Sequence, residues 1–360
     1  MKSKISLSQF VLLLFCCRML SSLVYIPGAN DFNSYSETLL INIISTVLQA
    51  VLLIPAFILN NKFSDDNIVM SAQRLAGKFG GVTCVFYYLY LLFCAIVSLT
   101  GYEYYMVNTV YPDSPALLIS GLLIFISAYA AFLGLEAVSR FSLFAALLLI
   151  AEIIIVFFSL SGQIEVVHLY PLNANINNIT QGVMMKTAEN SDLVLLLFLL
   201  PRIKGKRYKG VMFYLLLSLT VFEVLNFLVI TVFGKLAETL MFPTFVLEIF
   251  THIAVFKNTN IIHALPWTFI TFIKITVYMI GINSILPQLL PKKIKAVNIP
   301  LNLILISLGT YMLTSNYDLF SQLYNYNIMF WVQVFLLTVI PVGLLFCRYC
   351  RDGNLLFLKK

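Results

Sequence analysis

The sequence predicts an all-α integral membrane protein with about ten transmembrane helices. Of its 360 residues, 60% are hydrophobic and 11% are charged, whereas a soluble domain of this length carries roughly a quarter charged residues. Apolar runs long enough to cross a bilayer, at about 20 residues each, recur from Val11 to Phe346. Most Lys and Arg residues lie in alternate loops between these runs, which indicates a fixed orientation.

We expect these runs to form one transmembrane domain over residues 1–360. The predicted spans are 8–27, 39–59, 80–108, 115–133, 141–160, 176–201, 211–233, 262–290, 298–315 and 328–348. With the N-terminus inside, 18 of the 23 Lys and Arg residues lie in inner segments, two in outer segments and three at membrane depth. The positive-inside rule therefore predicts cytoplasmic N- and C-termini. Short amphipathic helices are predicted at 68–78 on the inside and at 240–256 on the outside.

No catalytic, cofactor or metal-binding motif is apparent. The three histidines show no H-E-x-x-H pattern, and no G-x-x-x-x-G-K-[ST] loop is present. Cys347 and Cys350 form a C-x-x-C, but no second such pair completes a tetrahedral metal site. We therefore expect neither an enzyme nor a bound cofactor or metal. The net charge of +7 is attributed to cytoplasmic loops at a lipid bilayer and not to nucleic-acid binding.

The first predicted span contains polar residues near its middle. Ser21 and Ser22 closely follow Arg18, and serine is a favoured residue at helix N-termini. A break here would give two half-helices, the second starting at Ser21 or Ser22, whose free N–H groups would favour a carboxylate. An unbroken helix with serines facing its neighbours explains this span equally well.

The sixth predicted span is interrupted more clearly. Only residues 193–200 are apolar after the polar stretch, and they cover half a membrane. The polar residues are Thr187, Glu189, Asn190, Ser191 and Asp192. Ser191 or Asp192 would cap the inner half-helix, and a non-helical segment at this depth must be buried or line a cavity. The alternative, a surface loop, leaves a span too short to cross.

Spans one and six hold matching positions in two halves of the chain, about 8–160 and 176–348. Paired interrupted helices indicate an inverted-repeat transporter fold with its ligand at the bilayer midplane. Single charges elsewhere in the spans, at Glu103, Glu152, Glu223 and Lys274, each cost about 2.5–3.5 kcal/mol when they face lipid. They are therefore expected to face the bundle interior. Lys274 would stand where a sodium-driven relative holds its coupling cation, or would form an ordinary interhelical ion pair.

Several motifs occur in a set order along almost the whole chain. They are Ile-Ser-Leu-Ser-Gln at 5–9, Tyr-Pro-Asp-Ser-Pro at 111–115, Gly-Leu-Glu-Ala-Val-Ser-Arg at 134–140 and Met-Phe-Pro-Thr-Phe at 241–245. Together they resemble the B subunits of nutrient-germinant receptors of endospore-forming bacteria. That family belongs to the amino acid–polyamine–organocation superfamily, so the resemblance implies a LeuT-type 5+5 inverted repeat with broken helices 1 and 6.

The motifs also suggest residues with structural or coupling roles. Glu136 and Arg140 are one helical turn apart and suited to a local pair at the inner surface, and Pro243 would open the outer helix. The chain departs from the family at Leu20, where Gly is frequent, at Glu248, where Arg is frequent, and at 258–261, where an acidic–basic pattern is usual. These departures concern the ligand site rather than the fold.

The resemblance implies a germinant-sensing subunit in the spore inner membrane, assembled with an A-type subunit and a C-type lipoprotein. A small nutrient of the amino acid class would bind at the midplane between spans one, three, six and eight. The candidate ligand-binding residues are Ser21, Ser22, Tyr102, Glu103, Glu189, Asn190, Ser191 and Lys274. The half-helix near Ser21 would hold the carboxylate, and Glu103 or Glu189 the amino group.

The second hypothesis is a proton-coupled amino acid transporter of the same superfamily. Glu103, Glu152 or Glu189 would then carry the proton. Fold alone does not separate sensing from transport.

Overall fold

The computed structural model describes residues 4–23, 37–63, 66–112, 114–170, 175–251, 259–289 and 298–357. In these ranges the chain is helical and forms no strand; one isolated bridge joins Ile5 to Ile203. Seven helical stretches of the described chain are long and apolar enough to cross a membrane. The protein is therefore an all-helical, multi-pass membrane protein, as its composition predicts.

The main helices follow one another with short connections. They are α1 (Leu7–Leu23), α2 (Thr38–Leu52), α3 (Ile54–Lys62), α4 (Ile68–Ala76), α5 (Lys78–Tyr105), α6 (Ala116–Leu133), α7 (Leu135–Leu160), α8 (Ile176–Glu189), α9 (Asp192–Leu199), α10 (Arg207–Phe233), α11 (Pro243–Ile249), α12 (Thr259–Leu289), α13 (Asn298–Ser315), α14 (Tyr317–Leu323), α15 (Tyr326–Val334) and α16 (Ile340–Phe357). Two π-helical segments, η2 (Met106–Val110) and η8 (Phe335–Val339), extend α5 and join α15 to α16.

Every predicted span coincides with a helix or with consecutive helices. The seven long apolar stretches match predicted spans two to five, seven, eight and ten. Spans one, six and nine match α1, the pair α8 and α9, and α13. The part of span one at 24–27 lies outside the described residues. The number of crossings and the 5+5 inverted repeat stay predictions.

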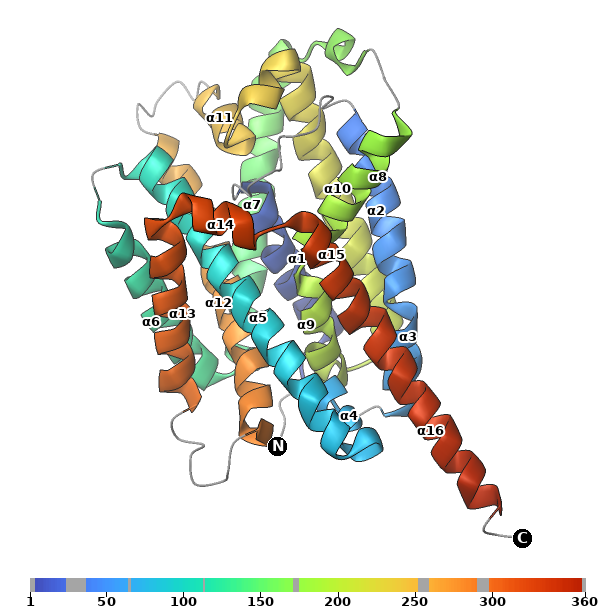
Figure 1. Ribbon diagram of the computed structural model, residues 1–360. Coiled ribbons are helices and arrows are strands. Elements are labelled where there is room, and N and C mark those ends of the chain that lie inside the picture. Colours follow the sequence, from blue (N-terminus) through green and yellow to red (C-terminus); the bar gives the residue numbers. More distant parts are fainter. Residues whose placement is uncertain are drawn as a thin grey trace.

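The helix α1 lies inside the bundle, in contact with α7, α10 and α12 (Figure 1). Around it, α5 packs against α12 and α13, α2 against α8 and α10, and α15 against α8. The start of α1 and the end of α16 lie towards the same end of the bundle, and α11 lies towards the other (Figure 1). An even number of crossings would place the two ends in this way.

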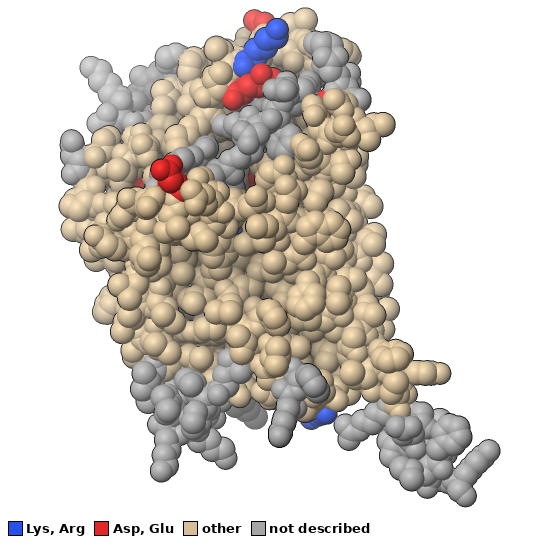
Figure 2. Space-filling model, viewed as in Figure 1, with Lys and Arg blue, Asp and Glu red and all other residues tan. Residues whose placement is uncertain are grey.

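The outer surface of the bundle is apolar. The large apolar side chains Phe125, Phe132 and Phe158, for example, are 70%, 75% and 70% exposed. The middle of the face in Figure 2 shows no Lys, Arg, Asp or Glu side chain. An apolar surface of this extent would aggregate in water, so it is suited to contact with lipid chains.

Both predicted amphipathic helices correspond to short helices. The inner one is α4, whose N-terminus is capped by Asn67: its side chain accepts a hydrogen bond from the N–H of Met70 at 2.9 Å. The outer one corresponds to α11, which begins at Pro243, a residue favoured in the first turn because the missing N–H would be unpaired there anyway. Its predicted continuation to 256 lies partly outside the described residues.

Candidate functional site

The sixth predicted span is broken inside the protein. Helix α8 ends at Glu189 and α9 begins at Asp192, so Asn190 and Ser191 form a non-helical link. Asn190 is buried, as are all residues of α9. The break predicted from the polar stretch is therefore present, and it is enclosed by protein as a break within a membrane must be.

Polar side chains from three other helices bond to the broken backbone and to Asn190. The Nδ2 of Asn190 donates to Gln49 Oε1 at 2.7 Å, and the Tyr214 hydroxyl donates to Asn190 Oδ1 at 3.0 Å. Gln333 Nε2 donates to the carbonyl of Ala188, in the last turn of α8, at 2.7 Å. These bonds satisfy groups that would otherwise be buried without partners, which is costly in an apolar interior.

Replacing Tyr214 with Phe is expected to lower the free energy of unfolding by about 1 kcal/mol, because it removes one buried hydrogen bond and leaves Asn190 Oδ1 unpaired. The melting temperature of the purified protein in detergent measures this. Tyr208→Phe is the matched control, since Tyr208 is on the same helix and exposed. Equal melting temperatures for the two variants would mean that Tyr214 does not stabilise the break.

Neither Ser191 nor Asp192 caps α9 with its side chain, so the predicted capping is wrong. No side-chain hydrogen bond reaches the first N–H groups of this helix. The Ser191 hydroxyl instead pairs with the Tyr278 hydroxyl at 2.7 Å, which itself donates to Asp192 Oδ1 at 3.1 Å. The Asp192 carboxylate faces α12 because a buried cation there, Lys274, requires a counter-charge.

Lys274 connects three helices at the centre of the bundle. Its side chain is 3% exposed, and Nζ lies 3.1 Å from Asp192 Oδ2 and 3.1 Å from the backbone carbonyl of Cys17 in α1. The interhelical ion pair expected as one alternative is therefore present.

Ser21 and Ser22 lie in the last turn of α1, which continues to Leu23. The Ser21 hydroxyl donates to the carbonyl of Arg18 at 2.8 Å, and the Ser22 hydroxyl donates to that of Met19 at 2.7 Å. The prediction that a second half-helix begins at either serine is wrong, because both hydroxyls bond back into their own helix.

The end of α1 is covered by α11. The Thr244 hydroxyl, next to Pro243, donates to the carbonyl of Ser22 at 2.9 Å. Phe242 and Phe245 pack edge-on against the Tyr105 ring of α5, at centroid distances of 5.7 and 5.8 Å. The short helix therefore ties the ends of α1 and α5 together on one side of the bundle.

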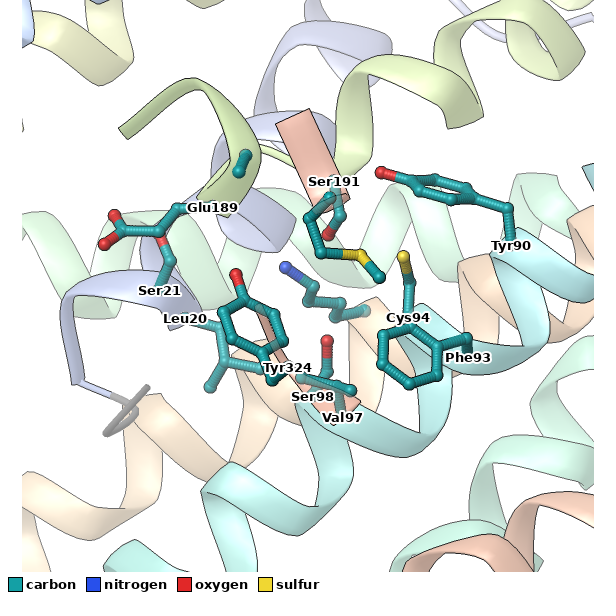
Figure 3. Close-up of a pocket in the computed structure, with 13 residues that line it drawn as sticks. Leu20, Ser21, Tyr90, Phe93, Cys94, Val97, Ser98, Glu189, Ser191 and Tyr324 are labelled. Carbon is teal, nitrogen blue, oxygen red and sulfur yellow. The ribbon is translucent and has the colours of Figure 1, made fainter. Parts of the chain in front are cut away.

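A cavity of about 40 Å³ lies beside the break (Figure 3). Its lining residues are Leu20, Ser21, Tyr90, Phe93, Cys94, Val97, Ser98, Ala188, Glu189, Ser191, Lys274, Tyr324 and Met329. In Figure 3, Ser21 and Glu189 lie on one side, Tyr90 and Cys94 on the other, and Tyr324 between them. Ligand pockets usually measure about 300–1,000 Å³, so an amino acid would enter only after the helices around the break move.

Four of the eight predicted ligand-binding residues meet at this cavity: Ser21, Glu189, Ser191 and Lys274. Glu189 already has a partner in its own helix, since both of its carboxylate oxygens lie 3.0–3.1 Å from Lys186 Nζ. The positive end of any bound ligand would therefore compete with Lys186 for this carboxylate.

The other four predicted residues do not line this cavity. The Tyr102 hydroxyl pairs with the Thr268 hydroxyl at 2.6 Å. Glu103 is buried and accepts hydrogen bonds from Thr314 at 2.8 Å and Ser120 at 3.4 Å. Ser22 and Asn190 do not line the cavity either.

Glu136 and Arg140 form the predicted pair at the start of α7. Arg140 Nη2 lies 2.6 Å from Glu136 Oε1, and both side chains are largely exposed. An exposed pair of this spacing is worth about 0.3–0.5 kcal/mol.

These features define a multi-pass helical membrane protein with a buried polar site at an interrupted helix. The model of the spore germination protein family matches residues 4–342, so the chain belongs to that family. It is similar to spore germination protein KB of Bacillus subtilis (strain 168), with 28% identity over 131 residues, which cover 34% of this chain and 35% of that protein. The match thus spans about a third of this relative's length.

Proposed function

We propose that this protein is the nutrient-sensing B-type subunit of a spore germinant receptor. It binds a small nutrient, of the amino acid class, at the break between α8 and α9 and thereby triggers germination. The observation that supports this most is the buried break itself, beside which Ser21, Glu189, Ser191 and Lys274 line one cavity. Membership of the spore germination protein family supports a role in germination.

The small cavity implies that binding changes the conformation. A ligand that enters must separate α1, α5, α8 and α12, and it would replace existing partners such as Lys186 at Glu189. The ligand therefore shifts the equilibrium from the closed to an open arrangement of these helices. The size of the shift equals the difference between its binding free energies for the two arrangements. In the proposed receptor, this shift acts on an A-type subunit and a C-type lipoprotein in the spore inner membrane.

The proposed orientation places both termini in the cytoplasm. Cysteine labelling in sealed, right-side-out vesicles tests it, with one new cysteine at either end. Cys347 and Cys350 are exposed and would first be changed to Ser, whereas Cys16, Cys17, Cys84 and Cys94 are buried. We expect labelling by a membrane-impermeant maleimide only after the vesicles are opened. Labelling of either end in intact vesicles would contradict the orientation.

Deletion of the gene is the test of the sensing role. In a strain without other nutrient receptors, we expect the deletion to abolish germination in a mixture of the common L-amino acids. Germination with external dipicolinate should remain, because it bypasses nutrient binding. Complementation with the intact gene is the control. A normal nutrient response in the deletion strain would reject the receptor hypothesis.

A proton-coupled amino acid transporter is the second candidate, and Glu103 is the observation that favours it. This buried carboxylate accepts hydrogen bonds from two hydroxyls and, among the described residues, forms no ion pair. Intramembrane carboxylates of this kind commonly relay protons. Uptake of labelled amino acids into proteoliposomes that contain this chain alone, driven by a pH gradient and lost in Glu103→Gln, would favour transport over sensing.

A further inference from the structure

The core around the break contains an uneven set of charges. Lys274 pairs with Asp192 across helices, and Lys186 pairs with Glu189 within α8. Arg18 of α1 is 6% exposed, yet no carboxylate of the described residues lies within ion-pair distance of it. The five side chains together therefore carry one net positive charge, on Arg18.

The contacts of Arg18 leave most of its donors unused. Nη1 donates to the Ser21 hydroxyl at 2.9 Å, and the guanidinium lies over the Phe222 ring at 4.6 Å from its centroid. A guanidinium has five N–H donors in a planar fork that matches a carboxylate. A buried cation with no counter-charge is destabilising unless an anion joins it.

A second, smaller cavity of about 10 Å³ adjoins Arg18 between α1, α2 and α10. Its lining includes Asn42, Ser218 and Gln49. The Oγ of Ser218 is buried there without a hydrogen-bond partner, and the Asn42 amide interacts with the Glu223 carboxylate. The cavity therefore combines a cationic fork with a hydroxyl group that is able to donate, which is the chemistry of an anion site.

We propose that Arg18 and this cavity form a carboxylate-binding site, and that the ligand of the protein is a carboxylate compound held there. For the biological ligand, this inference rests on the proposed function. Ser21 links the two cavities, since it lines the larger one and accepts a hydrogen bond from Arg18. A ligand lying across Ser21 would place its carboxylate at Arg18 and its amino group towards Glu189.

Thermal unfolding of the purified full-length chain in detergent tests the site with sodium formate as the probe. Sodium chloride at the same concentration and ionic strength is the comparison. We expect formate, and not chloride, to raise the melting temperature of the wild type. Arg18→Met should weaken apparent formate binding by about tenfold to a hundredfold, the loss of a charge-assisted contact. Without formate it should melt no lower than the wild type, because it removes an unpaired buried charge.

Two further variants keep the test decisive if Arg18→Met fails to fold. Arg18→Lys keeps the charge without the fork and should bind formate with intermediate affinity. Arg74→Met removes an exposed arginine of α4 that pairs with Asp66 and should bind formate as the wild type does. Formate binding that is absent from the wild type, or unchanged in both Arg18 variants, would overturn the proposal. Equal stabilisation by chloride would overturn the assignment to a carboxylate.

The formate assay and the germination assay fail separately. If the deletion strain germinates normally while formate binding depends on Arg18, the sensing role is wrong and the carboxylate site stands. If the deletion abolishes germination while Arg18 variants bind formate as the wild type does, the sensing role stands and the site is wrong.

Discussion

Replacing Lys274 with Met is expected to lower the free energy of unfolding by about 3–5 kcal/mol, because it leaves a buried carboxylate without its counter-charge. Asp192 is fully buried, and Lys274 Nζ, at 3.1 Å, is its one cationic partner among the described residues. The Tyr278 hydroxyl alone would then bond to that carboxylate. Unfolding in mixed micelles, followed by circular dichroism, measures the change.

The double variant Lys274→Met with Asp192→Leu shows whether the loss of stability comes from the unpaired charge or from the packing of the lysine. Since it removes both ions, it should recover most of the lost stability, although Tyr278 then loses one acceptor. Lys235→Met is the matched control, because Lys235 is an exposed lysine. A double variant as unstable as Lys274→Met alone would show that the lysine acts through packing rather than through charge.

The sequence predicts the fold class well because the bilayer imposes long apolar segments that are visible in composition. The break in the sixth span was also predictable, since the polar residues from Thr187 to Asp192 leave apolar segments too short to cross alone. Its position at Asn190 and Ser191 follows from that stretch. The polarity of a segment was therefore enough to predict its structure where that structure depends on the segment alone.

The serines of the first span were ambiguous for a physical reason. A serine hydroxyl can cap the N-terminus of a helix or bond to the carbonyl three residues before it. In α1, Ser21 and Ser22 do the second. Which bond forms depends on whether the helix is interrupted at the serines. Two serines in an apolar run do not determine this.

The partners that hold the break could not be predicted, because each lies far away in sequence. Gln49 and Asn190 are 141 residues apart, and Gln333 and Ala188 are 145 apart. An isolated glutamine in an apolar run indicates a buried partner, but the run does not say which one. For the same reason Lys274 was predicted to face the interior without Asp192 being named as its counter-charge.

Ser21→Leu and Ser191→Leu are expected to abolish the nutrient response while the protein stays in the membrane. Both serines line the 40 Å³ cavity from opposite elements, α1 and the link before α9. A leucine at either position fills space that a ligand would need. Ser21→Leu also removes the hydroxyl that contacts Arg18, and Ser191→Leu removes the one that contacts Tyr278.

Ser284→Leu is the matched control for these two variants. Ser284 is a half-buried serine of α12 that bonds back to the carbonyl of Gly281, as Ser21 does to that of Arg18, but it does not line the cavity. Dose–response curves for germination, normalised to the amount of protein in the membrane, decide the outcome. We expect the control to respond within about twofold of the wild type, because Ser284 does not line the cavity. If Ser21→Leu and Ser191→Leu respond as Ser284→Leu does at equal abundance, the ligand does not bind at the break, and the site must be sought elsewhere in the bundle.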